Sequence, residues 1–550
     1  MPDTSYRQRI IDVRDAIRTL RRARLVAGMR PDKYFRIATA LRREGATNTA
    51  GIAMSAVRCP QRPALIDELG VLTYRELDER ANAFAAALQQ QPGGNPQMVA
   101  IMCRNHRGLV DALAAADRIG ADALLLNTSF AAPALADVVS RERPDVIVYD
   151  EEFTESVEAA LAGQPDTPAV VAWTEQPARH DATVETLIAA YRGQRPYPTR
   201  RRGKLILLTS GTTGTPKGAR RSPGGGLSEL TAVLSTVPWR AEETTVVAAP
   251  MFHAWGYGQL VLGTLLSCTL VVCRKFDPEA TLVLVDRHRA TGLSVVPVMI
   301  DRIMELPDDV RSRYSARSLR FVTASGSRMR PDVVVKFMDE FGDVIYNNYN
   351  ATEVGMIATA TPADLRVAPD TAGKPPPGVE IRILDENHSQ VATGEVGQIF
   401  VRSGSHFDEY TSGTTKHTYH GFMATGDLGR LDESGRLFVV GRDDEMIVSG
   451  GENVYPIEVE QVLAAHPDVV EAAVLGVDDE RFGQRLAAFV VPKRGSSITP
   501  EALKEHVRHN LANYKVPREI TILDELPRTS TGKIIRRELQ ARTGARGSHR

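Results

Sequence analysis

Short apolar runs alternate with helical patterns between about residues 60 and 330. Thr73 and Glu76 form a capping box, and a helical repeat of apolar residues continues from there to residue 88. Buried strands separated by helices predict an α/β domain with largely parallel sheets. Six runs are short and almost entirely apolar, as buried strands are: residues 98–102, 146–149, 169–173, 205–208, 244–248 and 293–296.

The pattern changes near Gly441. Residues 428–440 predict a short hairpin that turns at residues 433–435. A compact α+β pattern then follows: a helix at 456–465, strands at 472–477 and 486–491, a helix at 500–511 and a strand at 519–523.

The chain has 550 residues, which is too long for one hydrophobic core. We predict three segments: an N-terminal extension at 1–47, a large α/β domain at 48–441 and a small α+β domain at 442–550.

Composition excludes several classes of protein. The formal net charge of -1 argues against a dedicated nucleic-acid partner. The four cysteines have no disulfide or C-x-x-C spacing, so we expect core thiols in a cytoplasmic protein. The longest near-continuous apolar run, residues 260–273, is too short to span a bilayer, which takes about 20 residues.

The first 47 residues are basic, with twelve Lys or Arg against five Asp or Glu. Ile10, Val13, Ile17 and Leu20 recur at helical spacing. One interpretation is that this apolar stripe packs on the protein body while the arginines face solvent. The other is a peripheral contact with an anionic membrane surface. We favour packing, since no Trp lies on the apolar face, and the membrane contact stays open.

A loop rich in glycine and hydroxyl groups follows the apolar run 205–208. Its glycines let the backbone turn sharply near a ligand, its N–H and hydroxyl groups can donate to phosphate oxygens, and Lys217 adds a cation. The spacing differs from the Walker loop, and a flexible linker rarely follows an apolar strand. The candidate phosphate ligands are Thr209, Ser210, Gly211, Thr212, Thr213, Gly214 and Lys217.

This loop resembles the phosphate loop of the adenylate-forming superfamily, which includes acyl-CoA synthetases, peptide-synthetase adenylation domains and luciferases. The resemblance covers residues 55–537 and implies a large multi-subdomain N-terminal adenylate-forming domain with a small mobile C-terminal domain. Its further motifs occur here in the family's order.

The segment 346–353 is similar to the family's Tyr-Gly-x-Thr-Glu motif. The resemblance places Tyr349 against adenine, Thr352 on the α-phosphate and Glu353 on Mg²⁺, with Asn348 in the same cofactor-binding segment. These roles suit a flat ring, a neutral donor and a hard oxygen ligand. Asn350 stands where the family usually has Gly. Because Asn tolerates a positive φ better than most residues, we expect the turn to be kept.

Further family positions follow from the same resemblance. Gly326 and Ser327 match a small-residue loop beside adenine. Asp427 matches the aspartate that binds both ribose hydroxyls, and Arg442 an arginine that also contacts ribose. The resemblance makes Asp444 the hinge about which the small domain turns, and Gly450 and Gly451 the lining of the CoA channel.

Lys533 matches the family's adenylation lysine and follows Gly532 on what we expect to be an exposed tip. A surface lysine is normally only solvated, so this role rests on the surrounding motif. A carboxylate must approach an anionic α-phosphate, and a cation between them lowers the repulsion.

His253 lies in a segment that matches the gate of the family's acyl pocket; the alternative is a hydrogen-bonded core histidine. Gly256, Gly258 and the apolar residues 260–266 could line a deep tunnel, which favours a fatty acid as substrate. His417 and His420 could suggest a metal, but we find no third ligand nearby and expect them to be solvated.

The resemblance implies a two-step ligase that uses ATP, Mg²⁺ and CoA. A fatty acid attacks the α-phosphate to give acyl-AMP, and the thiol of CoA then displaces AMP. A fatty acyl-AMP ligase that delivers its adenylate to a carrier protein stays open as the alternative. A luciferase-like oxidoreductase and an inactive nucleotide-binding scaffold are the weaker alternatives.

Overall fold

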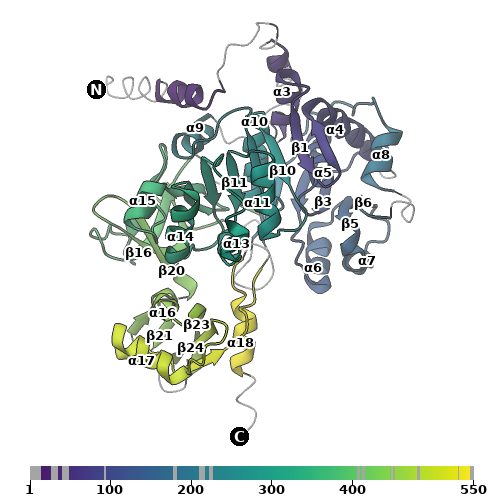
Figure 1. Ribbon diagram of the computed structural model, residues 1–550. Helices are drawn as coiled ribbons and strands as arrows, with labels where there is room; N and C mark the ends of the chain where they lie inside the picture. Colours follow the sequence, from purple (N-terminus) through teal and green to yellow (C-terminus); the bar gives the residue numbers. More distant parts are fainter. Residues whose placement is uncertain are drawn as a thin grey trace. The chain divides into compact units, whose positions relative to one another are not determined.

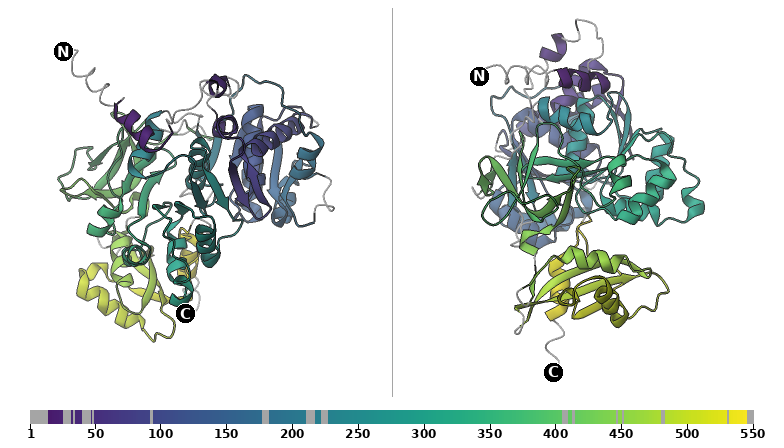
Figure 2. Two further views of the ribbon diagram at one scale, coloured as in Figure 1. Left: turned by 45° about the horizontal axis from the view of Figure 1, so that its top comes forward. Right: turned by 90° about the vertical axis from the view of Figure 1, so that its left-hand side faces the viewer.

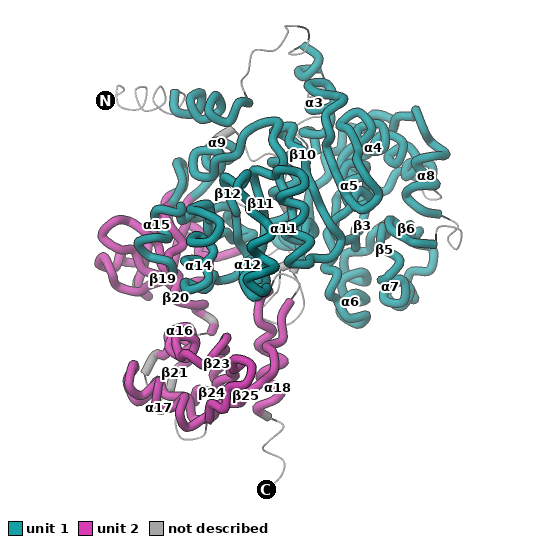
Figure 3. The backbone as a smooth tube through the Cα atoms, viewed as in Figure 1, with its two compact units in different colours: residues 1–370, 375–379, 403–415 teal, residues 371–374, 380–402, 416–550 magenta. Residues whose placement is uncertain are grey.

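A computed structural model describes most of the chain in two compact units (Figure 3). Unit 1 comprises Met1–Asp370, Pro375–Val379 and Ser403–Thr415, and unit 2 comprises Thr371–Lys374, Glu380–Arg402 and Lys416–Arg550. The units do not follow chain order, so they do not test the predicted boundaries at 47 and 441. The described residues are 14–25, 32, 35–39, 47, 49–91, 94–176, 182–209, 217–221, 227–404, 409–411, 415–445, 447–449, 452–479, 483–529 and 532–544.

The first sheet of unit 1 has seven strands within the described residues, in the order β17-β8-β7-β4-β3-β5-β6. Strands β3 to β7 pair in parallel, while β8 pairs antiparallel with β7 and β17 antiparallel with β8. The strands are β3 (Met98–Met102), β4 (Asp122–Leu125), β5 (Val146–Asp150), β6 (Ala169–Trp173), β7 (Leu205–Thr209), β8 (Lys217–Arg221) and β17 (Glu409–Tyr410). Its helices are α5 (Arg107–Ile119), α6 (Ala132–Glu142), η1 (Glu151–Phe153), α7 (Thr154–Leu161) and α8 (Val184–Ala190).

The second sheet of unit 1 has eight described strands, in the order β14-β13-β12-β11-β9-β10-β1-β2. All pairs are parallel except the two at the edges. The strands are β1 (Pro63–Asp67), β2 (Gly70–Thr73), β9 (Thr244–Val247), β10 (Thr269–Val272), β11 (Gly292–Val295), β12 (Phe321–Ala324), β13 (Ile345–Ala351) and β14 (Gly355–Ala360). The helices of this part, several of which Figures 1 and 2 show beside the sheet, are α3 (Ala50–Arg58), α4 (Tyr74–Gln89), α9 (Leu227–Thr236), α10 (Ala254–Leu265), α11 (Pro278–Arg287), α12 (Pro297–Met304), α13 (Asp308–Arg311), α14 (Pro331–Phe341) and α15 (Pro362–Val367).

The six predicted strands are confirmed as β3, β5, β6, β7, β9 and β11, and their pairing is largely parallel as expected, the exception being the antiparallel pair β7-β8. The predicted capping box is confirmed at α4, where Thr73 accepts from the backbone N–H of Glu76 and the Glu76 side chain accepts from Thr73. Such a cap stabilises a helix by about 1 kcal/mol.

The loop after β3 joins the two sheets of unit 1. The guanidinium of Arg107 pairs with Asp67 at the end of β1, with the Asp67 side chain fully buried. Asn105 accepts from the backbone N–H of Met251 at 2.7 Å and donates to the carbonyl of Ala249 at 2.9 Å. Asp67 is the last residue of β1, and Ala249 and Met251 follow β9, so these contacts hold the second sheet against the first. One hydrophobic core spans both sheets.

The described part of the N-terminal extension packs on the rest of unit 1 through only part of the predicted apolar stripe, of which Ile10 and Val13 lie outside the described residues. Residues 14–22 are helical, Leu20 and Ala23 are buried, and the carbonyl of Ala23 accepts from the backbone N–H of Ala241 at 2.7 Å. Ile17 and Phe35, by contrast, are exposed. Among all described helices, none has both the length and the apolar character that crossing a bilayer requires.

Unit 2 contains two sheets in which most strand pairs are antiparallel. One has the order β15-β16-β19-β18 with β20 on β19, and the other β22-β21-β24-β23 with β25 parallel to β24. The first comprises β15 (Glu380–Leu384), β16 (Gly397–Arg402), β18 (Thr418–Tyr419), β19 (Phe422–Leu431) and β20 (Leu437–Arg442). The second part comprises η3 (Asp443–Glu445), β21 (Ile447–Ser449), β22 (Glu452–Val454), α16 (Pro456–Ala464), β23 (Val469–Asp479), β24 (Gly483–Pro492), α17 (Pro500–Asn510), η4 (Asn513–Lys515), β25 (Glu519–Ile522) and α18 (Arg536–Gly544). The hairpin β19-β20 and the order of elements from α16 to β25 agree with the sequence prediction.

Candidate active site

The glycine-rich loop connects β7 to β8. Thr209 ends β7, Lys217 begins β8, and the two residues are register partners, so the loop leaves the end of a sheet as predicted. The side chains of these two residues are not described. Ser210, Gly211, Thr212, Thr213 and Gly214 lie outside the described residues. Their phosphate contacts therefore stay predictions.

The Thr-Glu motif forms the turn between β13 and β14. Thr352 and Glu353 are half-buried, and Gly355 closes the turn with a φ of 75°. Glu353 presents a carboxylate, the hard oxygen donor that Mg²⁺ prefers. Its oxygen Oε1 accepts a 2.5 Å hydrogen bond from the hydroxyl of Tyr410 on β17. The second carboxylate oxygen of Glu353 can still accept, so this residue fits the Mg²⁺ that the family resemblance implies.

Tyr410 is a residue that the sequence analysis missed. It lies 57 positions after Glu353 on a strand of two residues, and no motif carries it.

Asn348 lies inside the second sheet and is buried. Its amide nitrogen donates to the hydroxyl of Thr323 at 2.7 Å, and its oxygen accepts from Thr359 at 3.0 Å. The side chain thus ties β12, β13 and β14 together. Its expected contact with the nucleotide stays a prediction. Tyr349, next to it on β13, is half-buried.

The expectation for Asn350 rested on a wrong premise about its backbone. Asn350 lies within β13 at an irregularity of the ladder, and it is not among the described residues with positive φ. The substitution for Gly therefore needs no left-handed conformation. Its amide instead donates to the hydroxyl of Ser325 at 3.1 Å, which joins the motif to the loop at Gly326 and Ser327. Gly326 has a φ of 108°, a conformation that favours glycine.

Carboxyl ends of parallel strands position these segments. The loops with His253 and Gly326 follow β9 and β12, and the Thr352 turn follows β13. Ligands on open α/β sheets bind at this edge. The second sheet of unit 1 therefore gathers the predicted gate, adenine loop and Thr-Glu motif at one edge.

His253 precedes the first turn of α10, and its ring lies 4.6 Å from that of Phe252 between centroids. It is half-buried, and its gating role stays a prediction.

The expected tunnel along α10 is not supported by the side chains proposed for it. Leu260, Leu262 and Leu266 are buried in the main core. A Cβ on Gly256 would meet the carbonyl oxygen of Pro250 at 2.2 Å, so this glycine serves close packing. Of the two glycines, Gly258 is the one at which an added Cβ would meet open space. These three leucines therefore give no support for a long acyl chain, and the class of acid stays a prediction.

Asp427 and Arg442 face each other in unit 2, on the adjacent strands β19 and β20. The Nη1 group of Arg442 donates to Oδ1 of Asp427 at 3.1 Å. The Asp427 backbone N–H is fixed by the hydroxyl of Thr425 at 3.0 Å. Two residues that the family resemblance assigned to ribose thus form one hydrogen-bonded pair.

Lys533 is exposed, as expected, and it belongs to a tight turn. Its backbone N–H donates to the hydroxyl of Thr529 at 3.1 Å, and Gly532 has a φ of 80°. Asp444 lies in the short helix η3, directly after β20, and its side chain is not described. Gly450 and Gly451 lie outside the described residues.

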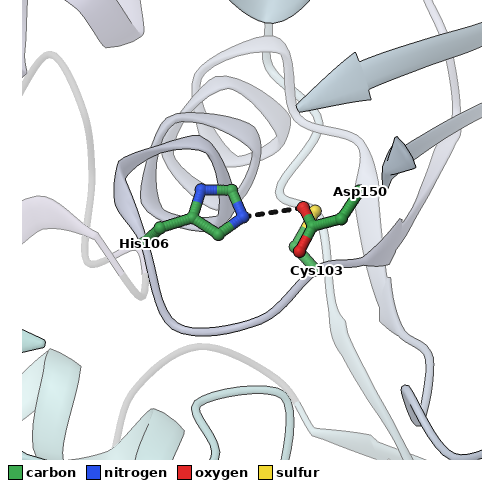
Figure 4. A group of neighbouring side chains, drawn as sticks. All are labelled: Cys103, His106 and Asp150. Atoms are coloured by element: carbon green, nitrogen blue, oxygen red, sulfur yellow. Dashed lines mark hydrogen bonds and ion pairs between the residues drawn. The ribbon is translucent and has the colours of Figure 1, made fainter. Parts of the chain in front are cut away.

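A buried group of Cys103, His106 and Asp150 resembles a metal site in composition (Figure 4). Nδ1 of His106 accepts from the backbone N–H of Gly108 at 3.0 Å, so Nε2 must carry the proton. This Nε2–H donates to Asp150 at 2.7 Å. With the ring's lone pair already engaged, we interpret the group as a hydrogen-bonded core that holds the loop after β3.

His417 has a partner that sequence spacing did not show. Its Nε2 lies 3.1 Å from Nε2 of His388, in the turn between β15 and β16, and the His388 ring stacks on Tyr419. His417 and His420 are both exposed, as expected, and His417 in addition contacts a residue 29 positions upstream.

Comparisons with known proteins agree with this architecture. The AMP-binding enzyme family matches residues 52–415, and the C-terminal domain of AMP-binding enzymes matches residues 458–533. An indoleacetate–CoA ligase of Aromatoleum aromaticum is 30% identical over 87% of this chain and 93% of its own length. A fatty acid–[acyl-carrier-protein] ligase, ScoC of Streptomyces coeruleorubidus, is 29% identical over 88% and 94%.

Among solved structures, ATP-bound MatB from Rhodopseudomonas palustris has a TM-score of 0.78 at 26% identity, covering 90% of this chain and 98% of its own. The fold is thus the α/β fold with a large N-terminal AMP-binding domain and a small C-terminal domain. By its matched residues and its fold, the chain belongs to the AMP-binding enzyme family.

Proposed function

We propose that this protein is an AMP-forming acid–thiol ligase that converts a carboxylic acid, ATP and CoA to acyl-CoA, AMP and pyrophosphate. The Asp427–Arg442 pair carries the proposal, because two separate family positions meet in one hydrogen-bonded contact. The Thr352 turn and the Gly326 loop, which lie at one sheet edge, support it further.

The residues of this chain divide the work of adenylation. Asp427 can accept hydrogen bonds from ribose hydroxyls, and Thr352 can donate to the α-phosphate. A Mg²⁺ ion on Glu353 would neutralise part of the charge on the phosphates. Lys217 would bind the outer phosphates and favour departure of pyrophosphate.

Lys533 would act only while the adenylate forms. It would lie between the incoming carboxylate and the α-phosphate and stabilise the charge that develops there. A turn of the small domain about Asp444 would then bring Gly450 and Gly451 to the thiol. The exposure of Lys533 supports this role, because an exposed ammonium group can reach a ligand.

The acceptor is the first open choice within this proposal. We propose free CoA, since the indoleacetate relative is a CoA ligase. The relative ScoC, a fatty acid–[acyl-carrier-protein] ligase, favours the alternative of delivery to a carrier protein. The two differ in whether product formation requires free CoA.

The acid is the second open choice. The sequence analysis favoured a fatty acid, and ScoC is consistent with one. The indoleacetate relative instead favours an aromatic acid, and the burial of Leu260, Leu262 and Leu266 weakens the argument for a long tunnel. We therefore propose an apolar acid, and we include aryl and alkyl acids in the test.

Pyrophosphate release with Mg·ATP tests the function directly. The acids are a chain-length series from acetate to oleate together with benzoate, indoleacetate and ferulate, each with and without CoA. We expect release to peak within one class of acid and acyl-CoA to form only when CoA is present. Accumulation of acyl-AMP regardless of CoA would favour the carrier-protein alternative, and no release with any acid would contradict the ligase.

A further inference from the structure

Tyr410 lies between β8, the strand that follows the glycine-rich loop, and the turn of unit 1 that contains Thr352 and Glu353. Its strand β17 pairs antiparallel with β8, the strand that begins at Lys217, and Tyr410 is the register partner of Ala219. Tyr410 is 7% exposed, so its ring is fixed by packing. The backbone of Thr411 extends the same pairing through a 2.7 Å hydrogen bond to the carbonyl of Gly218.

The same chain segment touches the Thr-Glu turn at two points. Near its start, the hydroxyl of Ser403 donates to the carbonyl oxygen of Val354 at 2.9 Å. Near its end, the hydroxyl of Tyr410 donates to Oε1 of Glu353 at 2.5 Å. Contacts to both the backbone and the side chain of one turn hold that turn against β17.

The Tyr410 contact acts on the carboxylate itself. A hydroxyl that donates to an ionised carboxylate makes one of the stronger hydrogen bonds in proteins, and it fixes the rotamer of a side chain with three torsions. Because only Oε1 accepts from Tyr410, Oε2 keeps its lone pairs for a cation.

We propose that Tyr410 is a positioning residue that orients Glu353 for the Mg²⁺ of the ATP complex; this inference rests on the proposed function. The hydroxyl holds one carboxylate oxygen, and the other would be available to the metal. Since β17 also pairs with β8, Tyr410 connects the strand that follows the glycine-rich loop to Glu353, the proposed metal ligand. Sequence comparison of short motifs does not reveal this link, because Tyr410 belongs to none of the family motifs identified above.

Tyr410→Phe tests the proposal, because it removes only the hydroxyl. Tyr314 provides a matched control: its hydroxyl donates to Oε1 of Glu279 at 2.8 Å, also within unit 1. ATP binding is measured by calorimetry across a range of Mg²⁺ concentrations, next to pyrophosphate release and the melting temperature of each variant.

We expect Tyr410→Phe to raise the Mg²⁺ concentration that half-saturates ATP binding by about tenfold, as loss of a hydrogen bond to a charged group does. Binding of ATP without Mg²⁺ and the melting temperature should stay unchanged, and Tyr314→Phe should behave as wild type. In Tyr410→Phe/Glu353→Gln, the tyrosine change should add nothing to the effect of Glu353→Gln.

Three results would overturn the proposal, and they can be distinguished from one another. If Glu353→Gln shifts the Mg²⁺ requirement but Tyr410→Phe does not, the metal role of Glu353 stands and the role of Tyr410 is wrong. If Glu353→Gln does not shift it, the assignment of Glu353 in the proposed function fails, and the inference fails with it. A fall in melting temperature together with unchanged Mg²⁺ dependence would make Tyr410 a structural residue only.

Discussion

Arg442 donates to Asp427 across the β19-β20 ladder, and the two residues are direct register partners. Fifteen positions separate them in the chain. A hairpin whose turn contains Gly435, at a φ of 74°, brings them together. The guanidinium fixes the orientation of the carboxylate.

We expect Asp427→Asn to weaken ATP binding and pyrophosphate release by at least about tenfold, because an amide cannot replace a charged acceptor for two donors. The melting temperature should change little. Asp432→Asn is the matched control, since Asp432 pairs with Arg436 at 2.7 Å in the turn of the same hairpin. Equal losses in both variants would mean that the hairpin fold, and not the nucleotide contact, is disturbed.

We expect Lys533→Ala to separate the two half-reactions. Formation of acyl-AMP should fall by about 100-fold or more, since the cation stabilises charge only in that step. Conversion of supplied acyl-AMP and CoA to acyl-CoA should be retained. Lys504→Ala, which removes a lysine near Glu501 on α17, should leave both steps unchanged. An equal loss of both half-reactions in Lys533→Ala would contradict a role confined to adenylation.

The buried pair of Asp67 and Arg107 predicts acid sensitivity of unit 1. Burial alone would raise the pKa of Asp67, but hydrogen bonds from the side chain and the backbone N–H of Arg107 bring that pKa below its ordinary value. A lowered pKa contributes stability that is present above the unfolded pKa of about 3.9 and is lost as pH falls through the folded pKa.

We therefore expect Asp67→Asn to destabilise the protein by about 3 kcal/mol at pH 7. The difference from wild type in the urea midpoint should shrink as pH falls below about 4. Glu380→Gln is the contrast: Glu380 also has a lowered pKa, caused by Arg402, but its pair is exposed and should contribute little. A constant difference between pH 3 and pH 7 would count against the assignment to Asp67.

The fold class could be predicted because the central strands are apolar on both faces. β3 and β7, for example, both pair in parallel with β4 and show as the apolar runs 98–102 and 205–208. β13 could not be found this way. Its sequence, Ile-Tyr-Asn-Asn-Tyr-Asn-Ala, is polar because its residues bond to neighbouring strands and border the candidate site. Function there overrides the apolar pattern that predicts strands.

The candidate site was predictable only where residues lie close in sequence. Glu353 and Lys533 were identified from short motifs, whereas their surroundings depend on distant parts of the chain. Tyr410 reaches Glu353 through a strand of two residues, and His388 meets His417 through two separate turns. Such contacts arise from strand pairing and turn geometry, which a single sequence does not encode as a spacing.

The final prediction concerns the N-terminal helix. Packing on the protein and contact with a membrane would depend on different residues of this helix. Packing depends on Leu20, whose burial contributes about 1.5–3 kcal/mol. Membrane contact would depend on exposed residues such as Ile17, which is 50% exposed, and on the basic side chains. We expect Leu20→Ala to lower the melting temperature and Ile17→Ala to leave it unchanged.

Cosedimentation with anionic vesicles completes this test. Since the described helix is engaged with unit 1, we expect deletion of residues 1–47 to lower the melting temperature without changing vesicle binding. A variant with Gln at Arg14, Arg18, Arg21 and Arg22 removes charge and keeps the apolar side. If that variant lost vesicle binding while its melting temperature stayed the same, the basic face would be the contact with the membrane, and the packing of Leu20 would serve only to hold the helix in place.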